Sequence, residues 1–498
     1  MSSLFSHASW GGVSAAIRLV FGVGSLFLSI RLAGAEFYGY LALMLSVTAF
    51  YVAFINSVHT IAVTRAAEYR SMPEVIADRT RLFSAVWLVT LLSVALLVLL
   101  ALPLGPAVIR TFVYTGDDAA VVRQLADLQM LVIALAACQL LVAGNVAVIE
   151  GLGRFDLAAR AQIFGPPATF VLLATGFVTN ASVDIVDVGR SYLLGTILEL
   201  AVTTWVRLRM GYRHALLPST QALVLIPELL RHGLMLQGAS LVNIFFDPFN
   251  KFLLNHFVGP ASVTAYEIAT KIVAGIRGLF GGAFRVFLQL SDKLGADGGE
   301  DYLKVMRYGM VPAMLMHGAG CVLMVLLSRF WLGSEMDELS LFYFLLIPSS
   351  IGIIFAAPLY GALIGIRDLA FIFRMHVNLA VLNLLASSLL IPFLGLYGAG
   401  VGLTLTTAYN AAAEYRRYIS MIGPIPGFGA EVGRLKSRFA GSVALTLAAL
   451  AADYVIQDVT ILVAVEAVVM TGFAVLFLME PLTARVMSSV LRRRGSKQ

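Results

Sequence analysis

Charged residues are scarce in this chain. Asp, Glu, Lys and Arg make up 13% of its 498 residues, whereas 59% of the residues are hydrophobic. A soluble domain carries about 25% charged residues. Because no soluble fold can bury so large an apolar excess, the composition excludes a soluble enzyme. It predicts an all-α polytopic membrane protein in which lipid is the solvent for much of the surface.

Cysteines and enzyme motifs are equally scarce. The two cysteines, Cys138 and Cys321, fall within apolar runs, which favours inert packing over a disulfide or metal site. The chain has no GxxxxGK[ST] motif for nucleotide binding, no metal-ligand cluster and no nucleophile motif. We therefore expect no catalytic residue, no metal and no cofactor. Transport would depend on H⁺ or Na⁺ coupling, on the membrane potential or on the cargo's own gradient.

The sequence also predicts neither long loops nor a cleavable leader. The start has no basic segment before a short apolar stretch, so the first span is expected to be retained. The longest expected loops are 209–231, 421–438 and 104–124, and none is long enough for a catalytic domain. This argues against a glycosyltransferase with a soluble domain and against a polymerase with a large outer loop.

Apolar runs of about 20 residues, enough to cross about 30 Å of hydrocarbon as a helix, recur along the whole chain. They are continuous rather than alternating, which favours helices over barrel strands. They predict about fourteen transmembrane helices near 10–33, 37–63, 81–103, 125–149, 158–180, 189–208, 232–257, 261–288, 305–332, 339–365, 371–394, 396–420, 439–457 and 460–480.

The spans group into two six-helix lobes and a two-helix extension. A weak internal repeat supports this: Gly34 to Tyr40 and Gly259 to Tyr266 each lead from one span into the next with Gly, a small residue and then Tyr. Two related halves are a common transporter plan. The expected divisions are an N-terminal lobe 1–210, an inter-lobe loop 211–231, a C-terminal lobe 232–422, a linker 423–438, a helix pair 439–482 and a basic tail 483–498.

Lys and Arg set the expected orientation. With both termini in the cytoplasm, cytoplasmic cations outnumber outer ones by about five to one, as the positive-inside rule requires. The chain is thus expected to be a multi-pass protein of a bacterial inner membrane. Its net charge of +6 is explained by this topology and not by nucleic-acid binding.

Ionisable residues inside spans mark candidate sites, because each costs roughly 2.5–3.5 kcal/mol on insertion scales. Arg18 shares one face of the first span with Ser14, Phe21, Ser25 and Ser29. This face either lines a watery cavity or carries an arginine that extends to the interface.

The seventh and eighth spans carry more such residues. Asn243, Asp247 and Asn250 share a face, and Lys251 follows Asp247 by four residues, so the two can form a pair in a span that Pro248 is expected to kink. The alternative is a purely structural ion pair. The eighth span carries Glu267, Lys271, Arg277 and Arg285, and the sixth carries Glu199.

Cations outnumber acids in this set, which predicts an anionic cargo. The candidate substrate-binding residues are Arg18, Lys251, Lys271, Arg277 and Arg285. The candidate polar or coupling residues are Asn243, Asp247, Asn250, Glu267 and Glu199.

Three segments resemble the Wzx-type polysaccharide and oligosaccharide flippases of the MOP superfamily. They are Arg31 to Leu43 with the Arg65 that follows, Asn243 to Lys271, and Leu396 to Thr404. The chain departs from the usual LGPEEYG signature, which is here Ala33 to Gly39, and Ala265 stands where the family more often has glycine before the tyrosine.

The resemblance implies two six-helix lobes around a cationic cavity that carries an undecaprenyl-pyrophosphate-linked oligosaccharide from the inner to the outer leaflet. It implies that Arg18, Lys251, Lys271 and Arg277 meet the pyrophosphate, and that the last two spans help form a groove for the polyprenyl tail. Expected partners are the lipid-linked oligosaccharide and membrane lipids, with a polymerase or chain-length regulator left open, and the protein is expected to be monomeric.

Three alternatives stay open. A lipid II flippase would share the pyrophosphate cargo. A cation-coupled MATE exporter would need an acid in the first lobe's cavity, but Trp10 to Ala35 contains none. A membrane-embedded ligase or polymerase would need a catalytic acid pair and a larger outer loop.

Overall fold

All regular structure in the described part of the chain is helical. The computed structural model describes residues 2–46, 59, 62–63, 66, 76–114, 116–179, 183–212, 225–227, 229, 246–288, 298–332, 336, 338–365, 368–456 and 458–478. Eight segments within these ranges are long and apolar enough to cross a membrane. The expectation of an all-helical, multi-span membrane protein is therefore confirmed.

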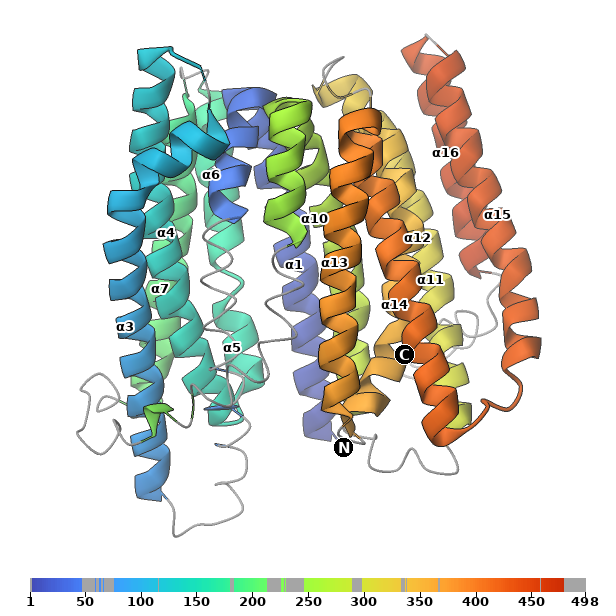
Figure 1. Cartoon of the computed structure of the whole chain (residues 1–498), viewed down its shortest axis with the longest axis horizontal. Coiled ribbons are helices and arrows are strands. Elements are labelled where there is room, and N and C mark those ends of the chain that lie inside the picture. Colours follow the sequence, from blue (N-terminus) through green and yellow to red (C-terminus); the bar gives the residue numbers. More distant parts are fainter. Residues whose placement is uncertain are drawn as a thin grey trace, which may run out of the picture. The chain divides into compact units, whose positions relative to one another are not determined.

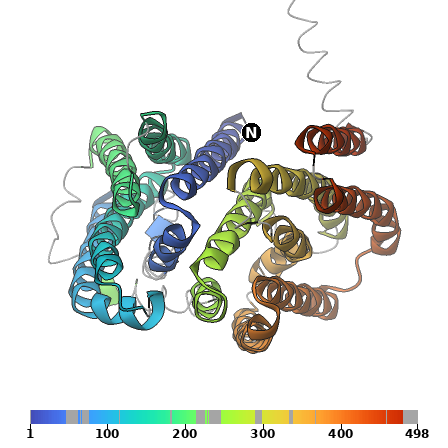
Figure 2. The ribbon, with the colours of Figure 1, turned by 90° about the horizontal axis from the view of Figure 1, so that it is seen from above.

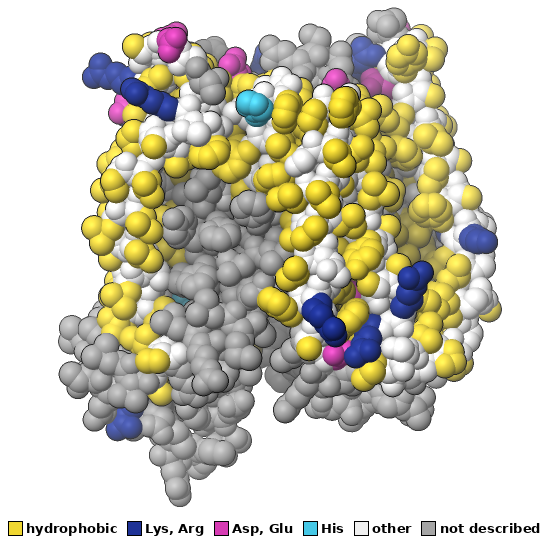
Figure 3. All heavy atoms as spheres, viewed as in Figure 1, with side chains coloured by type: hydrophobic (Ala, Val, Ile, Leu, Met, Phe, Trp, Pro, Cys, Tyr) yellow, Lys and Arg dark blue, Asp and Glu magenta, His cyan; other side chains and the backbone are white. Residues whose placement is uncertain are grey.

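Figure 1 shows and labels the helices of the described part of the chain. Figure 3 shows hydrophobic side chains covering most of the coloured surface at mid-height, as expected for contact with lipid. The bounds are α1 Ser2–Ala33, α3 Ile76–Val108, α4 Ala119–Gly151, α5 Phe155–Ala161, α6 Gly165–Val178, α7 Ile185–Arg209, α10 Pro260–Leu288, α11 Gly298–Leu327, α12 Leu339–Gly365, α13 Leu369–Leu394, α14 Leu396–Ile422, α15 Phe428–Val455 and α16 Val459–Leu478.

Four predicted spans are helices but fall outside the eight strongly apolar segments. One is α16, of which Thr460–Phe473 counts only as a shorter apolar helix. The others are α7, α10 and α14, which cover 189–208, 261–288 and 396–420. Polar and charged side chains such as Glu199 and Lys271 lower their mean hydropathy. Two further predicted spans, 37–63 and 232–257, lie partly outside the described residues, and their described parts, 35–46 and 246–257, are helical.

The predicted outer loop 104–124 is largely wrong. Helix α3 continues to Val108, a π-helical turn covers Ile109–Val113, and α4 begins at Ala119. Pro103 and Pro106 lie inside the last turns of α3. A transmembrane helix tolerates such prolines when neighbouring groups satisfy the freed backbone. The π turn closes with the amide of Tyr114 donating to the carbonyl of Ile109 at 2.8 Å.

Two other boundaries also differ from the prediction. The span predicted at 158–180 is divided between α5 and α6, and α6 opens with proline in its first turn, where its missing amide proton is not needed. The linker predicted at 423–438 is helical from Phe428 onward. Gly427, with φ 79°, directly precedes the first residue of α15. Glycine reaches this left-handed conformation without the steric cost that other residues bear.

The backbone packs as two compact units. Unit 1 contains residues 1–267 and 376–395, and unit 2 contains residues 268–375 and 396–498. In unit 1, α4 packs against both α3 and α7, and α1 packs against α6. In unit 2, α12 packs against α14 and α11 packs against α15. Figure 2 shows the helices of unit 1 nearly end-on. The predicted domain divisions remain a prediction.

The two repeated lead-in segments meet inside unit 1. Gly34 and Gly259 both adopt positive φ, 87° and 123°. The hydroxyl of Thr264 donates to the carbonyl of Ala35 at 2.5 Å. A Cβ placed on Gly39 would lie 2.0 Å from the carbonyl oxygen of Pro260. Gly39 is therefore needed for the second lead-in segment to pack against the first.

We expect Gly39→Ala to destabilise the protein, by about 1–3 kcal/mol as in other overpacked sites. The added methyl group meets a backbone carbonyl, which cannot rotate away. Gly22→Ala is the matched control, because nothing lies within 4 Å of a Cβ at that helical glycine. Thermal unfolding in detergent measures both, and equal midpoints for the two variants would contradict the close contact.

Candidate functional site

A buried lysine is the centre of the clearest site in unit 1. Lys251 lies on the helix 246–257, and its side chain is only 3% exposed. Its Nζ contacts Asp247 Oδ2 at 2.6 Å and also contacts Glu267 Oε2. The ammonium donates a third bond to Ser46 Oγ at 2.7 Å. All three protons of the ammonium thus have an acceptor.

The two carboxylates differ in their surroundings. The Glu267 side chain is 8% exposed, whereas that of Asp247 is 46% exposed. Ser46 also lies 3.4 Å from Asp247 Oδ2 and can donate to it. One lysine and two acids leave this cluster with one excess negative charge when all three are ionised. Asp247, the exposed member, is the group from which water or a proton can reach the cluster.

Aromatic and polar side chains enclose the cluster. The ring centre of Tyr266 lies 6.0 Å from Lys251 Nζ, and Asn250 Nδ2 lies 3.4 Å from the Tyr266 hydroxyl. Tyr38 is buried, shares a hydrogen bond with Tyr192 and lies within electrostatic range of Glu267. The network therefore joins α7, residues 35–46, residues 246–257 and the first turns of α10.

Sequence reasoning found part of this site. The Asp247–Lys251 pair forms as the four-residue spacing predicted, and Glu267 and Asn250 lie beside it. Lys251, however, is saturated by two acids and a hydroxyl, so it is no longer a suitable ligand for a pyrophosphate. Asn243 lies outside the described residues, and so does the side chain of Arg285.

The polar face of α1 is a packing face rather than a row of cavity-lining groups. Ser14, Ser25 and Ser29 are buried, and Ser14 donates to the carbonyl of Ala159 at 3.0 Å. Phe21 makes an edge contact with Phe170 of α6 at 5.4 Å. Small hydroxyl residues allow such close helix contacts in membranes.

Arg18 is the exposed member of that face. Its Nη1 lies 3.5 Å from Gln162 Oε1, and it lies within electrostatic range of Glu199. The Glu199 carboxylate lies against Gly165, where a Cβ would come within 2.3 Å of Oε2. The fold thus brings Arg18 and Glu199 together, although nothing in the sequence linked them.

The remaining predicted cations belong to unit 2. Lys271 and Arg277 lie on α10 and are half-buried. Arg277 lies within electrostatic range of His317, whose two ring nitrogens contact Tyr343 Oη at 3.1 Å and Ser350 Oγ at 2.7 Å. Among the described residues, no group of three His, Cys, Asp or Glu could hold a metal ion.

The candidate residues chosen from the sequence do not include Arg207. The side chain is fully buried at the end of α7, and its guanidinium lies 4.2 Å from the ring centre of Trp87. Within the described part of the chain, none of its three nitrogens has a hydrogen-bond partner. The four-residue spacing to Thr203, also buried, was the one available signal that Arg207 belongs to the inner face of α7.

Solved structures with this arrangement of helices are membrane transporters and flippases. The lipid II flippase MurJ in an inward closed conformation matches with a TM-score of 0.68 at 11% identity, over 94% of this chain and 99% of that one. An inward-facing multidrug resistance MATE family transporter of the MOP superfamily matches with a TM-score of 0.63 at 15% identity, over 82% of this chain and 98% of that one. The chain has the MOP-superfamily fold.

A eukaryotic MATE transporter shares this MOP fold as well, with a TM-score of 0.55 at 13% identity over 84% of this chain and 95% of that one. No family model matches the sequence, and no curated protein matches it. The likeness therefore lies in the backbone, where helix lengths and packing are retained at identities too low to carry a function across.

Lys251→Met should strongly destabilise the protein, by about 3–5 kcal/mol, because removing one partner of a buried ion pair leaves the other charge buried and unpaired. Lys251→Met combined with Glu267→Gln should regain part of this loss. Lys436→Met, at an exposed position on α15, is the control. Midpoints of thermal unfolding in detergent test this, and an unchanged midpoint for Lys251→Met would refute the cluster.

Arg207→Met should leave stability unchanged or raise it by about 1–4 kcal/mol, since a buried charge without hydrogen bonds costs more than an apolar side chain of similar length. The methionine sulfur keeps contact with the Trp87 ring. Arg209→Met is the control: Arg209 stands over Trp205 at 5.1 Å but is exposed, so its replacement should have little effect. A lower unfolding midpoint for Arg207→Met alone would contradict this account.

Proposed function

We propose that this protein is a flippase that moves an undecaprenyl-pyrophosphate-linked oligosaccharide from the cytoplasmic to the periplasmic leaflet of a bacterial inner membrane. The cargo would serve synthesis of a surface polysaccharide. The proposal joins the resemblance of the sequence to sugar flippases with the MOP fold of the backbone. It also extends to the predicted cytoplasmic position of both termini.

The observation that carries the proposal is the extent of the match to a lipid flippase. The MATE transporters cover 82% and 84% of this chain, whereas the lipid II flippase covers 94%. The lipid II flippase thus matches a larger share of this chain than these MATE transporters do.

The surface of α16 suits a polyprenyl chain. Its buried residues Leu462, Glu466, Val469 and Phe473 recur every three or four positions and form one stripe. The rest of the helix exposes apolar side chains, including Val468 at 71%. Such a helix can present an apolar surface both to lipid acyl chains and to the tail of a lipid-linked sugar.

The charges favour an anionic cargo over a cationic drug. Glu199 lies within electrostatic range of Arg18, and Asp247 and Glu267 both contact Lys251. Glu199 and the buried Glu267 therefore have cations beside them and are poor receptors for a cationic drug. A MATE-type exporter of cationic compounds is accordingly the weaker alternative, whereas a lipid II flippase, which carries the same pyrophosphate, is the stronger one.

The Lys251 cluster is suited to a coupling role. Neutralising the exposed Asp247, by a proton or by a bound Na⁺, would leave Lys251 paired with Glu267 alone and remove the excess negative charge. The membrane potential supplies a further driving force, because each negative charge moved outward gains about 2.3 kcal/mol per 100 mV. We propose that the potential acts on the cargo and that this cluster responds to the coupling ion.

Reconstitution into liposomes tests the function directly. Purified protein should speed the transfer of a fluorescent undecaprenyl-pyrophosphate oligosaccharide between leaflets, measured as the fraction that an impermeant quencher reaches. Arg18→Ala and Lys271→Ala, each made separately, should slow transfer about ten-fold or more, the effect of losing one charge-assisted contact. Arg31→Ala, an exposed arginine in the last turn of α1, should not.

Assays with other cargoes distinguish the alternative functions. Faster transfer of lipid II than of the oligosaccharide would favour the lipid II flippase, and uptake of a cationic dye driven by a proton or sodium gradient would favour a MATE exporter. Normal transfer by both Arg18→Ala and Lys271→Ala, with normal insertion, would remove the basis for a cationic path.

A further inference from the structure

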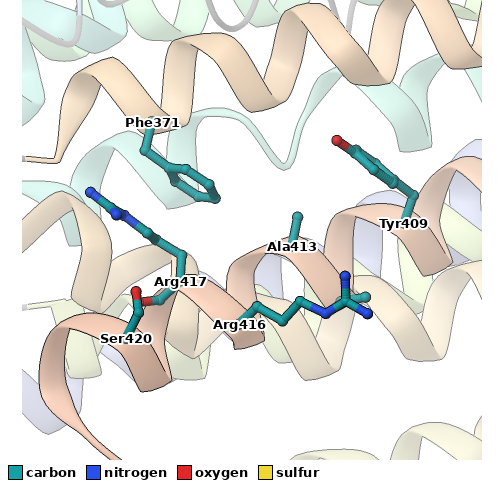
Figure 4. A pocket seen from close by; sticks show the side chains of 7 residues that line it. Phe371, Tyr409, Ala413, Arg416, Arg417 and Ser420 are labelled. Carbon is teal, nitrogen blue, oxygen red and sulfur yellow. The ribbon is translucent and has the colours of Figure 1, made fainter.

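A small pocket in unit 2 lies beside two arginines at the end of α14. Its volume is about 360 Å³. Figure 4 shows the side chains around it: Phe371 comes from the first turn of α13, and Tyr409, Ala413, Arg416, Arg417 and Ser420 come from α14. None of these residues belongs to the Lys251 cluster or to the set of cations assigned to cargo.

The pocket exists because small residues stand between large ones on one face of α14. Tyr409, Ala413, Arg416 and Ser420 recur at four, three and four residues, which places them on the same side of the helix. The methyl group of Ala413 leaves room between the phenol ring and the guanidinium of Arg416. In Figure 4 these two larger side chains stand on either side of Ala413.

One of the two guanidinium groups is held in place. Arg417 Nε contacts Asp368 Oδ2 at 2.6 Å, and the guanidinium lies 5.4 Å from the ring centre of Phe371. These contacts fix its position without burying it completely, since its side chain is 34% exposed. A guanidinium held this way can bind an anion with little further loss of side-chain freedom.

The second guanidinium is uncommitted. Arg416 is exposed and has no ion-pair partner in the described ranges. Arg374, three residues after Phe371, is exposed and donates only to the carbonyl of Ala370, at 3.3 Å. The carboxylate of Asp368 is already paired with Arg417. Glu414 is buried, with 2% exposure, and it lies on another side of the helix because it precedes Arg416 by two residues. The local charge at the pocket is positive.

Apolar surface continues from the pocket along the same elements. Leu405 precedes Tyr409 by one turn and is 53% exposed, and Phe373 on α13 is 49% exposed. In Figure 3, Lys and Arg side chains lie near the lower end of this face with hydrophobic side chains above them. A cationic end that borders an apolar surface is complementary to an amphiphile with a negative head group.

We propose that this pocket binds the phosphate head group of an anionic phospholipid, with Arg416 and Arg417 on the phosphate and the acyl chains along Leu405 and Tyr409. A free phosphate would use only the arginines and gain nothing from the apolar walls. The positive-inside pattern assigns this end of α14 to the cytoplasmic leaflet, where anionic lipids are enriched. The site is independent of the cargo proposed above.

Native mass spectrometry of the delipidated, full-length protein tests the site. Phosphatidylglycerol should bind more tightly than phosphatidylcholine. Arg416→Gln should weaken phosphatidylglycerol binding roughly ten-fold, the effect of one charge-assisted bond. Ala413→Leu should weaken it without changing any charge, because the larger side chain fills the pocket. Arg434→Gln, which removes another exposed arginine, on α15 and paired with Glu431, should bind as the parent protein does.

Three results would overturn the proposal. Equal binding of phosphatidylglycerol and phosphatidylcholine would remove the role of charge. Unchanged binding in both Arg416→Gln and Ala413→Leu would place the lipid elsewhere. Competition by millimolar inorganic phosphate as effective as that by the lipid would identify a phosphate site without a lipid requirement. Lipid transfer in liposomes is measured separately, so loss of the flippase activity would leave this result intact.

Discussion

The pairing of Lys251 with Asp247 and Glu267 is the interaction on which the interior of unit 1 depends. A charge within a membrane protein is tolerated only where partners replace the water that it has lost. Here the partners come from residues far apart in the chain: Ser46 on one helix, Asp247 on the lysine's own helix, and Glu267 at the start of α10. Each helix is therefore constrained by the need to bring its polar group to the same point.

The same constraint separates three kinds of cation in this protein. Lys251 is buried and saturated, Arg207 is buried against the ring of Trp87, and Arg416 is exposed beside an apolar pocket. Sequence hydropathy treats all three as one positive charge near or within a span. Only the tertiary structure shows that their surroundings differ.

The MOP fold leaves the cargo to be chosen by side chains. MATE transporters and a lipid II flippase share this fold at 11–15% identity to the chain, so the fold by itself does not determine the cargo. In this chain, Asp247 and Glu267 both contact Lys251, and α16 exposes apolar side chains such as Val468.

The sequence by itself determined the helical, multi-span class, because apolar runs of membrane length leave the backbone no alternative to helix in lipid. It also determined the Asp247–Lys251 pair, since a four-residue spacing on a helix is local geometry. Only the tertiary structure decided that Glu267 and Ser46 complete that cluster. It also decided that Arg18 lies near Glu199 and that the Pro260 carbonyl packs closely against Gly39. These contacts join distant segments, and periodicity along one helix shows which face is polar but not which partner that face will meet.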